Sequence, residues 1–143
     1  MSMANVLLVD DEVPFVEAMS RRLKKRDISI VTSFSGLEAL EVLEDDRSVE
    51  VVILDVKMPG MDGIETLGEI RKRFPLVEVI MLTGHATVET GIDGMKLGAF
   101  DYLMKPCDMD VLMEKLKEAV AKKRRHEEKI IEARVKEITA RRA

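Results

Sequence analysis

The sequence predicts one α/β domain built on a parallel sheet, followed by a helical extension. Three observations lead to this prediction. Five short apolar segments alternate with five stretches in which apolar residues recur at helical spacing. The connections between these segments are short, as in doubly wound α/β sheets. The chain has 143 residues, of which 46% are hydrophobic and 35% are charged, which is enough for one core but too little for two.

The expected strands are five short runs made mostly of aliphatic or β-branched residues. Apolar residues dominate each run and mostly follow one another directly. Strands of this kind are covered on both faces, which is typical of parallel sheets. The runs cover residues 5–9, 28–32, 49–54, 77–82 and 100–104.

The five expected helices follow these runs in order. Pro14 suits the first turn of the first helix, where a missing N–H is not needed. Apolar residues at helical spacing mark each helix. These residues are Val16, Met19 and Leu23; Leu37, Leu40 and Leu43; Ile64, Leu67 and Ile70; Val88, Ile92 and Met95; and Met109, Leu112, Leu116 and Val120.

Composition excludes several classes of protein. The longest apolar runs are only a few residues, whereas a membrane-spanning helix needs about 20. Residues 1–5 have neither a basic stretch nor a long apolar one, so no secretory signal is expected. The single cysteine, Cys107, rules out an internal disulfide and a cysteine-built metal site. A cytoplasmic location is therefore the default expectation.

Charge divides the chain into an acidic body and a basic extension. Residues 1–120 hold 14 lysines and arginines against 23 aspartates and glutamates, a net charge of −9. Residues 121–143 hold 9 lysines and arginines against 4 glutamates, a net charge of +5. The acidic body argues against nucleic-acid binding by this domain. The extension has no glycine or proline and can continue the last helix, with a new apolar stripe at Ile131, Val135 and Ile138.

Polar residues follow four of the five expected strands. Sites in open α/β sheets form beyond the carboxyl ends of the strands. We therefore expect carboxylates, a hydroxyl and an ammonium group to converge at one edge of the sheet. They are Asp10, Asp11 and Glu12 after the first strand, Asp55 after the third, Thr83 after the fourth and Lys105 after the fifth.

The expected cluster of carboxylates predicts a magnesium site. Oxygen ligands without histidine or cysteine favour a hard cation such as Mg2+. Clustered carboxylates repel one another, and a divalent ion keeps them ionised. Asp10 or Asp11 could instead cap the following helix. Two adjacent aspartates together with Asp55 are, however, more than one cap requires.

Asp55 is the expected nucleophile. It ends a buried strand and precedes a loop with turn signals at residues 59–60 and 62–63. Beside Mg2+ and Lys105, its carboxylate can accept a phosphoryl group whose charge the metal and the ammonium group neutralise. Alone, Lys105 would be interpreted as a solvated surface residue and Thr83 as an ordinary strand residue. Their positions after strands make them phosphate-binding candidates.

These motifs resemble those of the receiver domain of two-component response regulators. The residues that carry the resemblance are Val9-Asp10-Asp11-Glu12, the loop LDVKMPGMDG at 54–63, Leu82-Thr83-Gly84 and Lys105-Pro106. The resemblance covers residues 4–120 and implies a flavodoxin-like fold with strand order 2-1-3-4-5. We expect residues 121–143 to extend the last helix as a linker or dimerisation segment. The alternative is a solvated helix whose basic run, residues 122–125, binds nothing.

The resemblance implies a role for each acidic residue. Asp55 would be the phosphoacceptor, taking a phosphoryl group from a phosphohistidine on a sensor kinase. Asp11, Asp55 and the backbone carbonyl of Lys57 would bind Mg2+ directly. Asp10 would act on the metal largely through water.

The resemblance also implies a switch. Thr83 and Lys105 would contact the phosphoryl group, and Tyr102 would be the aromatic switch residue. The phosphoryl group would give Thr83 a new hydrogen-bond acceptor, and the space vacated by Thr83 would let Tyr102 turn in. This movement would remodel the face formed by the fourth helix, the fifth strand and the fifth helix. The Lys105–Pro106 bond resembles one that the family holds in cis.

The sequence thus predicts a phosphorylation-dependent signalling switch and not a metabolic enzyme. Expected partners are a sensor histidine kinase or phosphotransfer protein and a downstream output domain or protein. A weak homodimer through residues 121–143 is a further expectation, whereas no membrane or nucleic-acid partner is expected. The alternative is a Mg2+-dependent phosphohydrolase with an aspartyl nucleophile. Such enzymes usually carry a second aspartate two residues after the nucleophile, where this chain has Lys57.

Overall fold

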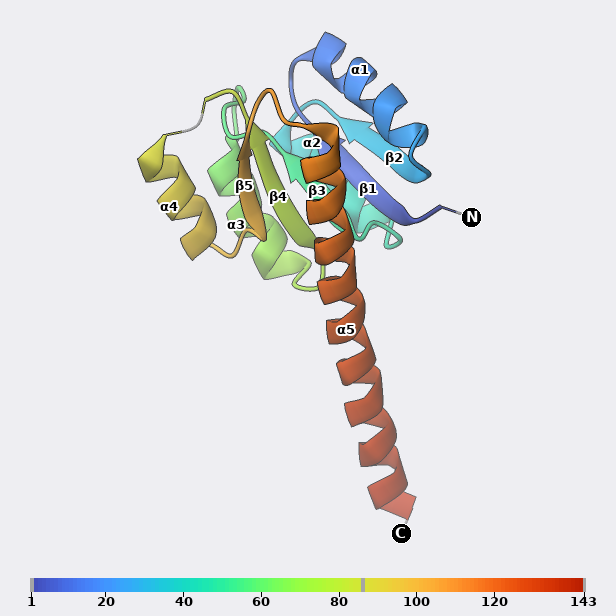
Figure 1. The fold of residues 1–143 in the computed structure, drawn as a ribbon. Coiled ribbons are helices and arrows are strands. Elements are labelled where there is room, and N and C mark those ends of the chain that lie inside the picture. The colour runs from blue at the N-terminus through green and yellow to red at the C-terminus, as the bar shows by residue number, and fades with distance from the viewer. Residues whose placement is uncertain (1, 86, 143) are drawn as a thin grey trace.

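Five parallel strands form one sheet in the order β2-β1-β3-β4-β5 (Figure 1). The structure, a computed structural model, describes residues 2–85 and 87–142. The strands are β1 (Ala4–Val9), β2 (Ile28–Ser33), β3 (Val51–Leu54), β4 (Glu78–Thr83) and β5 (Asp101–Met104). The expected fold class and strand order are confirmed, with strand ends shifted by one or two residues from the apolar runs.

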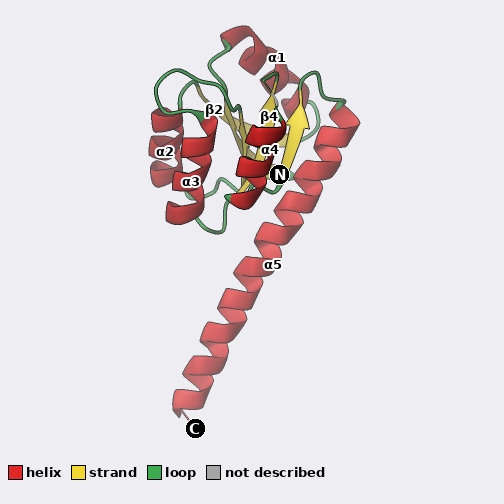
Figure 2. Ribbon diagram, turned by 90° about the vertical axis from the view of Figure 1, so that its left-hand side faces the viewer, coloured by secondary structure: helices red, strands yellow, loops and turns green. Residues whose placement is uncertain are grey.

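Five helices cover both faces of the sheet (Figure 2). They are α1 (Val13–Lys24), α2 (Gly36–Asp45), α3 (Gly63–Arg73), α4 (Val88–Lys96) and α5 (Met109–Arg142). The apolar sides of α1 and α5 share one core with alternate residues of the strands, and those of α2 and α3 share the other. Two cores, one on each face, explain why the central strands β1, β3 and β4 are almost entirely buried, as expected. The edge strands β2 and β5 are partly exposed, so the expectation of cover on both faces is wrong for them.

Local signals account for the helix starts. Pro14 lies in the first turn of α1, as expected. The side chain of Ser35 accepts a hydrogen bond from the N–H of Glu38 at 3.2 Å and caps α2. Asp62 caps α3 in the same way through the N–H of Glu65 at 2.9 Å. These caps position the loops that surround the carboxyl ends of the strands.

The apolar stripe of α4 faces away from the core. Val88 is 81% exposed, and Ile92 and Met95 are each 49% exposed. The buried residue of α4 is Gly94, which lies against the ring of Tyr102. Helical spacing therefore predicted the presence of this helix. The side of α4 that packs on the domain, however, is the one with Gly94, and the apolar side is left exposed.

The last helix continues well past the sheet (Figure 1). α5 runs without interruption for 34 residues, so the expected extension of the last helix is confirmed. Its first turns bury Leu112, Leu116 and Val120 against the sheet, whereas all side chains from 128 to 141 are exposed. Among residues 2–85 and 87–142, no helix combines the length and apolar character needed to cross a bilayer.

Candidate functional site

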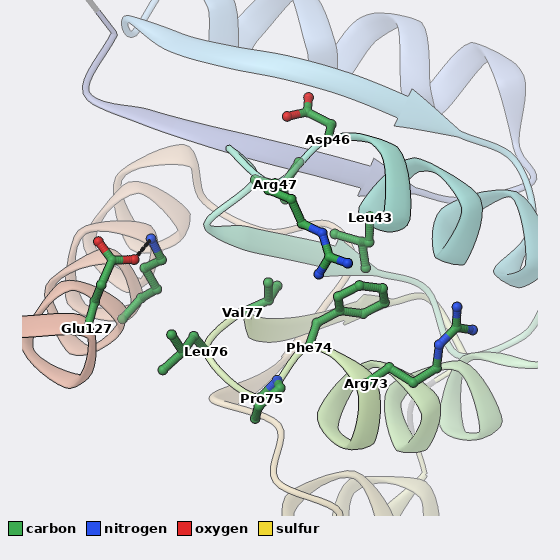
Figure 3. A pocket seen from close by; sticks show the side chains of 11 residues that line it. Leu43, Asp46, Arg47, Arg73, Phe74, Pro75, Leu76, Val77 and Glu127 are labelled. Atoms are coloured by element: carbon green, nitrogen blue, oxygen red, sulfur yellow. Dashed lines mark hydrogen bonds and ion pairs between the residues drawn. The ribbon is translucent and has the colours of Figure 1, made fainter. Parts of the chain in front are cut away.

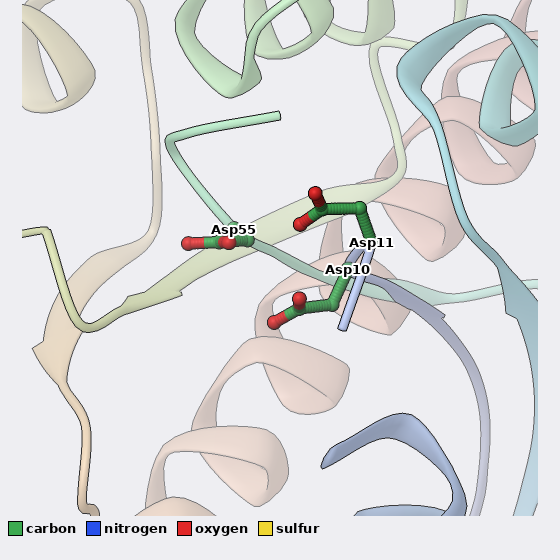
Figure 4. A group of neighbouring side chains, drawn as sticks. All are labelled: Asp10, Asp11 and Asp55. Atoms are coloured by element: carbon green, nitrogen blue, oxygen red, sulfur yellow. The ribbon is translucent and has the colours of Figure 1, made fainter. Parts of the chain in front are cut away.

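Three aspartates meet at the carboxyl edge of the sheet (Figure 4). Asp10 and Asp11 follow β1, and Asp55 follows the neighbouring strand β3. One carboxylate oxygen of each lies within 4.8 Å of the other two. Asp10 and Asp55 are buried, whereas Asp11 is exposed. The structure thus brings together the three carboxylates that the strand-end argument placed here.

Backbone hydrogen bonds fix the two buried aspartates just beyond the last paired residues of their strands. The N–H of Asp55 donates to the carbonyl of Val9 at 3.0 Å, and the N–H of Asp10 donates to the carbonyl of Ser33 at 3.2 Å. Both residues therefore continue the ladder of their strand by one position. This is why a residue directly after a central strand has a well-defined place in the site.

The loop after Asp55 is held close by a glycine. The N–H of Gly63, the first residue of α3, donates to the carbonyl of Val56 at 2.7 Å. A Cβ atom at position 63 would overlap the carbonyl oxygen of Asp55 and approach the Cα of Val56 to 2.6 Å. Only glycine allows α3 to begin directly against the backbone of Asp55.

The carboxylate of Asp55 has one free oxygen. Its Oδ1 accepts a hydrogen bond from the N–H of Val56 at 2.8 Å. Its Oδ2 is buried and accepts no hydrogen bond from any described residue. Buried polar atoms are nearly always paired, so this oxygen is an unsatisfied acceptor that a hydrogen-bond donor or a cation would stabilise.

Lys105 supplies a cation to the cluster. Its Nζ lies 2.6 Å from Oδ2 of Asp10 and 3.4 Å from Oε1 of Glu12. It also lies 3.9 Å from the centroid of the Phe15 ring, a cation–π contact. Burial is the largest single influence on the pKa of Lys105 and by itself would lower it. The hydrogen bond to Asp10 and the charges of Asp10, Asp55 and Glu12 together outweigh burial. The pKa of Lys105 is therefore raised, and its ammonium form is favoured.

The electrostatics of the cluster fit a divalent cation. Burial raises the pKa of Asp10, and the nearby charge of Asp55 adds to this effect. The hydrogen bonds from Lys105 and from the N–H of Glu12 only partly oppose it. Asp10, Asp11 and Asp55 with one ammonium group leave an excess of negative charge, and all the available side-chain ligands are carboxylate oxygens. A hard cation such as Mg2+ is the ion that this donor set suits.

Helix capping does not account for the acidic pair. The N-cap residue of α1 is Glu12, and its side chain makes no capping hydrogen bond. Oδ1 of Asp10 accepts the N–H of Glu12 itself at 2.9 Å, which tightens the turn and leaves the N–H groups of the first helical turn uncapped. The capping alternative for Asp10 and Asp11 is therefore wrong.

Thr83 lies at the end of β4 beside the cluster. It is fully buried, and its Oγ1 accepts a hydrogen bond from the N–H of His85 at 3.0 Å. Its carbonyl accepts the N–H of Lys105 at 2.9 Å, which joins the ends of β4 and β5. The Lys105–Pro106 peptide bond is cis. Lys57 and His85 are exposed, and together with Asp11 they line a hollow above the site.

Tyr102 is turned towards α4. Its hydroxyl lies 2.6 Å from Oγ1 of Thr90, and an ideal Cβ on Gly94 would lie 3.5 Å from its ring. Sequence reasoning missed two residues here. Thr90 carried a signal, because it completes a capping box with Thr87 at the start of α4. Phe15 carried none, because its contact with Lys105 joins segments that are far apart in the chain.

Comparison with known proteins gives consistent results. A family model described as "Response regulator receiver domain" matches residues 6–117. The chain is 39% identical over 121 residues to a putative response regulator NtrX-like of Rickettsia bellii, which covers 83% of this chain and 25% of that protein. It is 37% identical over 117 residues to the transcriptional regulatory protein ZraR of Escherichia coli O157:H7, covering 82% and 26%. The chain thus spans about a quarter of the length of these relatives.

Solved structures are similar as well. A response regulator receiver domain protein from Clostridium thermocellum matches with a TM-score of 0.81 and 35% identity, covering 85% of this chain and 98% of that one. NtrX from Brucella abortus, solved in complex with ADP, matches with a TM-score of 0.79 and 30% identity, covering 90% of this chain and 28% of that one.

Proposed function

The chain belongs to the response regulator receiver domain family, and we propose that Asp55 is its phosphoacceptor. Receiver domains of this family are regulatory parts of two-component signalling systems, consistent with a phosphorylation-dependent switch. One observation carries the assignment of Asp55. Its Oδ2 is buried without a hydrogen-bond partner and belongs to a carboxylate held beside Asp10 and Asp11. The phosphohydrolase alternative is not favoured.

The proposed reaction is a direct phosphoryl transfer. Oδ2 of Asp55 attacks the phosphorus of a phosphohistidine, the P–N bond breaks, and the donor imidazole leaves with its electron pair and takes up a proton. Lys105 neutralises charge on the phosphoryl oxygens. Asp11, Asp55 and the carbonyl of Lys57 would hold Mg2+ directly and Asp10 largely through water, and the ion neutralises further phosphoryl charge when bound. Self-dephosphorylation would be the only other chemistry of the domain.

The proposed switch starts at Thr83. A phosphoryl group on Asp55 offers the O–H of Thr83 a charged acceptor and draws the hydroxyl towards Asp55, whereas at present Oγ1 accepts the N–H of His85. Inward rotation of Tyr102 would then break the bond between Tyr102 and Thr90. Moving such an equilibrium from 1:99 to 99:1 takes about 5.5 kcal/mol. One charge-assisted hydrogen bond supplies only about 1.5–3 kcal/mol, so a partner has to complete the shift.

The face that would change is already apolar. Ile92 and Met95 of α4 and Met104 of β5 are exposed. Exposed apolar side chains of this kind suit a protein partner. We therefore propose that a downstream output domain or protein recognises this face, and that a sensor histidine kinase or phosphotransfer protein is the phosphoryl donor. With these partners we propose a cytoplasmic location.

We expect Thr83→Ala to separate phosphorylation from signalling. The variant keeps Asp55, Lys105 and the metal ligands, so it should accept a phosphoryl group. It lacks the switch hydrogen bond, which is worth about 1.5–3 kcal/mol. Phosphorylation should therefore shift the equilibrium between the outward and inward positions of Tyr102 at least about 10-fold less than in wild type. Amide exchange around Tyr102, measured with and without phosphorylation, tests this expectation. Thr83→Ser keeps the hydroxyl and is the matched control. Equal changes in Thr83→Ala and wild type would contradict the mechanism.

We also propose that residues 121–143 are a linker that can pair with a second copy. Ile131, Val135 and Ile138 are about half exposed, and they lie on one side of α5. Pairing two such helices would bury this stripe, although the repulsion of the basic residues makes the dimer weak at low salt. Salt or phosphorylation should strengthen it.

Sedimentation at increasing protein concentration tests the dimer. In the double variant Ile131→Gln, Ile138→Gln, the helix should persist because glutamine is a good helix former. The variant lacks most of the apolar stripe, so self-association should be lost. Replacing Ala133 and Ala140 with glutamine introduces the same residue at the same spacing on another side of the helix, and should have no effect. If wild type remains monomeric at high concentration, phosphorylated or not, the extension is a linker only.

A further inference from the structure

Two buried carboxylates lie at the edge of the sheet opposite the aspartates. Glu50 directly precedes β3, and Glu78 is the first residue of β4. Their side chains are only 7% and 0% exposed. The N–H of Glu78 donates to the carbonyl of Glu50 at 3.1 Å, so the two residues are neighbours across the ladder. Buried carboxylates are stable only when cations or hydrogen bonds compensate their charge.

For Glu50, most of that compensation comes from the extension, beside one hydrogen bond from the N–H of Asn5 in β1 to Oε1 at 3.3 Å. Arg124 binds Glu50 with both ends of its guanidinium group, Nε to Oε2 at 2.9 Å and Nη2 to Oε1 at 3.1 Å. The same Nη2 donates to the carbonyl of Met3 at 3.2 Å. Neither side-chain oxygen of Glu78 accepts a hydrogen bond from a described residue. Its charge is met by ion pairs alone, the shorter one with Nζ of Lys122, 3.6 Å from Oε1. The body itself contributes Arg71, whose Nη1 is more distant from that oxygen, at 3.9 Å.

These contacts lie where the extension leaves the body. Val120 is the last residue of α5 in the apolar core, and from residue 128 to 141 every side chain is exposed. Between these points, Lys123 binds Glu127 at 2.6 Å, and both line a hollow with Pro75 and Leu76 of the loop before β4 (Figure 3). The alternative in which the basic run binds nothing is therefore wrong for Lys122 and Arg124.

We propose that Glu50 and Glu78 are positioning residues for the extension. They clamp Lys122 and Arg124 to the ends of β3 and β4, and so fix both the helical order of residues 121–127 and the direction in which the remaining helix leaves the body. The other ends of the same two strands carry Asp55 and Thr83. The extension is thus attached to the strands on which phosphorylation acts, and its attachment does not depend on any partner.

The clamp also sets the orientation of the apolar stripe. Positions 124, 131, 135 and 138 are separated by 7, 11 and 14 residues from the first, which places them near one side of an α-helix. Because Arg124 faces the body, Ile131 and the stripe below it point to the same side. A helix that pairs with this stripe therefore contacts α5 on the side that carries Arg124.

Exchange of glutamate for glutamine tests the clamp, because it removes the charge and keeps the shape. In the double variant Glu50→Gln, Glu78→Gln, amide exchange of residues 121–127 should be about tenfold faster, equivalent to ~1.4 kcal/mol. Exchange in β3 and the rate of phosphoryl uptake should not change. Glu44→Gln, which weakens only exposed pairs with Arg47 and Arg73, is the control. Unchanged exchange in 121–127, or an equal rise throughout the body, would overturn the proposal.

A variant on the other side of the contact keeps the test valid if the double variant folds poorly. Arg124 is 53% exposed, so Arg124→Gln should fold. It should release the extension as Glu50→Gln does, and combining the two should add little, because both remove the same contact. Additive effects would show that Glu50 and Arg124 act independently and would overturn the clamp.

The direction in which the extension leaves the body is measured separately, by the distance between two spin labels. In a Cys107→Ser background, one label at Asp45→Cys reports on the body and one at Ala133→Cys reports on the extension. The distance distribution should be narrow when Glu50 and Glu78 are intact and broad with Glu50→Gln and Glu78→Gln. A distribution that stays narrow and unshifted would show that the carboxylates do not set the direction.

Discussion

Asp55→Asn is expected to take up no phosphoryl group under conditions in which the wild type takes up one. The amide is a poor nucleophile, and it replaces the oxygen that is buried without a partner in the site. The variant also loses one of the clustered carboxylates, which weakens binding of the cation that the reaction needs. Intact mass after incubation with a small phosphodonor and Mg2+ measures the uptake directly.

Two controls separate the role of Asp55 from general effects of charge. Asp45→Asn removes the same charge from an exposed position at the end of α2, and should be labelled like wild type. Chelation of Mg2+ should stop labelling of wild type, because the carboxylates would then repel the incoming phosphate. Continued labelling of Asp55→Asn would move the phosphoacceptor to Asp10 or Asp11 and refute the assignment.

Gly63→Ala is expected to lower both the stability of the protein and the rate of phosphoryl uptake. The added Cβ meets backbone atoms of Asp55 and Val56, which cannot rotate away as a side chain can. Overpacking of this kind destabilises a protein by about 1–3 kcal/mol or more. Relieving it requires α3 to move away from the loop that holds Asp55, so the nucleophile is displaced as well.

The same helix offers a matched control. A Cβ on Gly68 would meet nothing within 4 Å, and Gly68 lies in the interior of α3. Gly68→Ala should therefore stabilise the protein by about 0.5–1 kcal/mol, the usual gain for this exchange in a helix. Urea unfolding of both variants measures the difference. Equal midpoints for the two variants would contradict the close approach of Gly63 to Asp55.

A large part of the fold and site could be predicted because the relevant signals are local. The continuous apolar runs of β3 and β4 indicate burial on both faces, and burial on both faces indicates a parallel sheet. Once the sheet is parallel, the residue after each strand belongs to one edge. Asp10 and Asp55 were therefore brought together by topology alone, although 45 positions separate them in the chain.

Helix orientation was not predictable in the same way. The spacing of Val88, Ile92 and Met95 indicates a helix, but in α4 the side that meets the rest of the domain is the one with Gly94. Periodicity defines which residues share a face, and it contains no information on what lies opposite that face. The packing of the Tyr102 ring beside Gly94 decides the matter, and this contact exists only in the folded domain.

By itself, the sequence determined where the elements lie, which strand ends carry the reactive groups and that a basic helix follows the domain. Each of these depends on residues close together in the chain or on the parallel connectivity of short repeats. Only the tertiary structure decided the partners of individual charges. Arg124 meets Glu50 across 74 positions and Lys105 meets Asp10 across 95. The sequence contains many opposite charges with which any one charged residue could pair. Only the folded backbone determines which of them lies near it and is shielded from water.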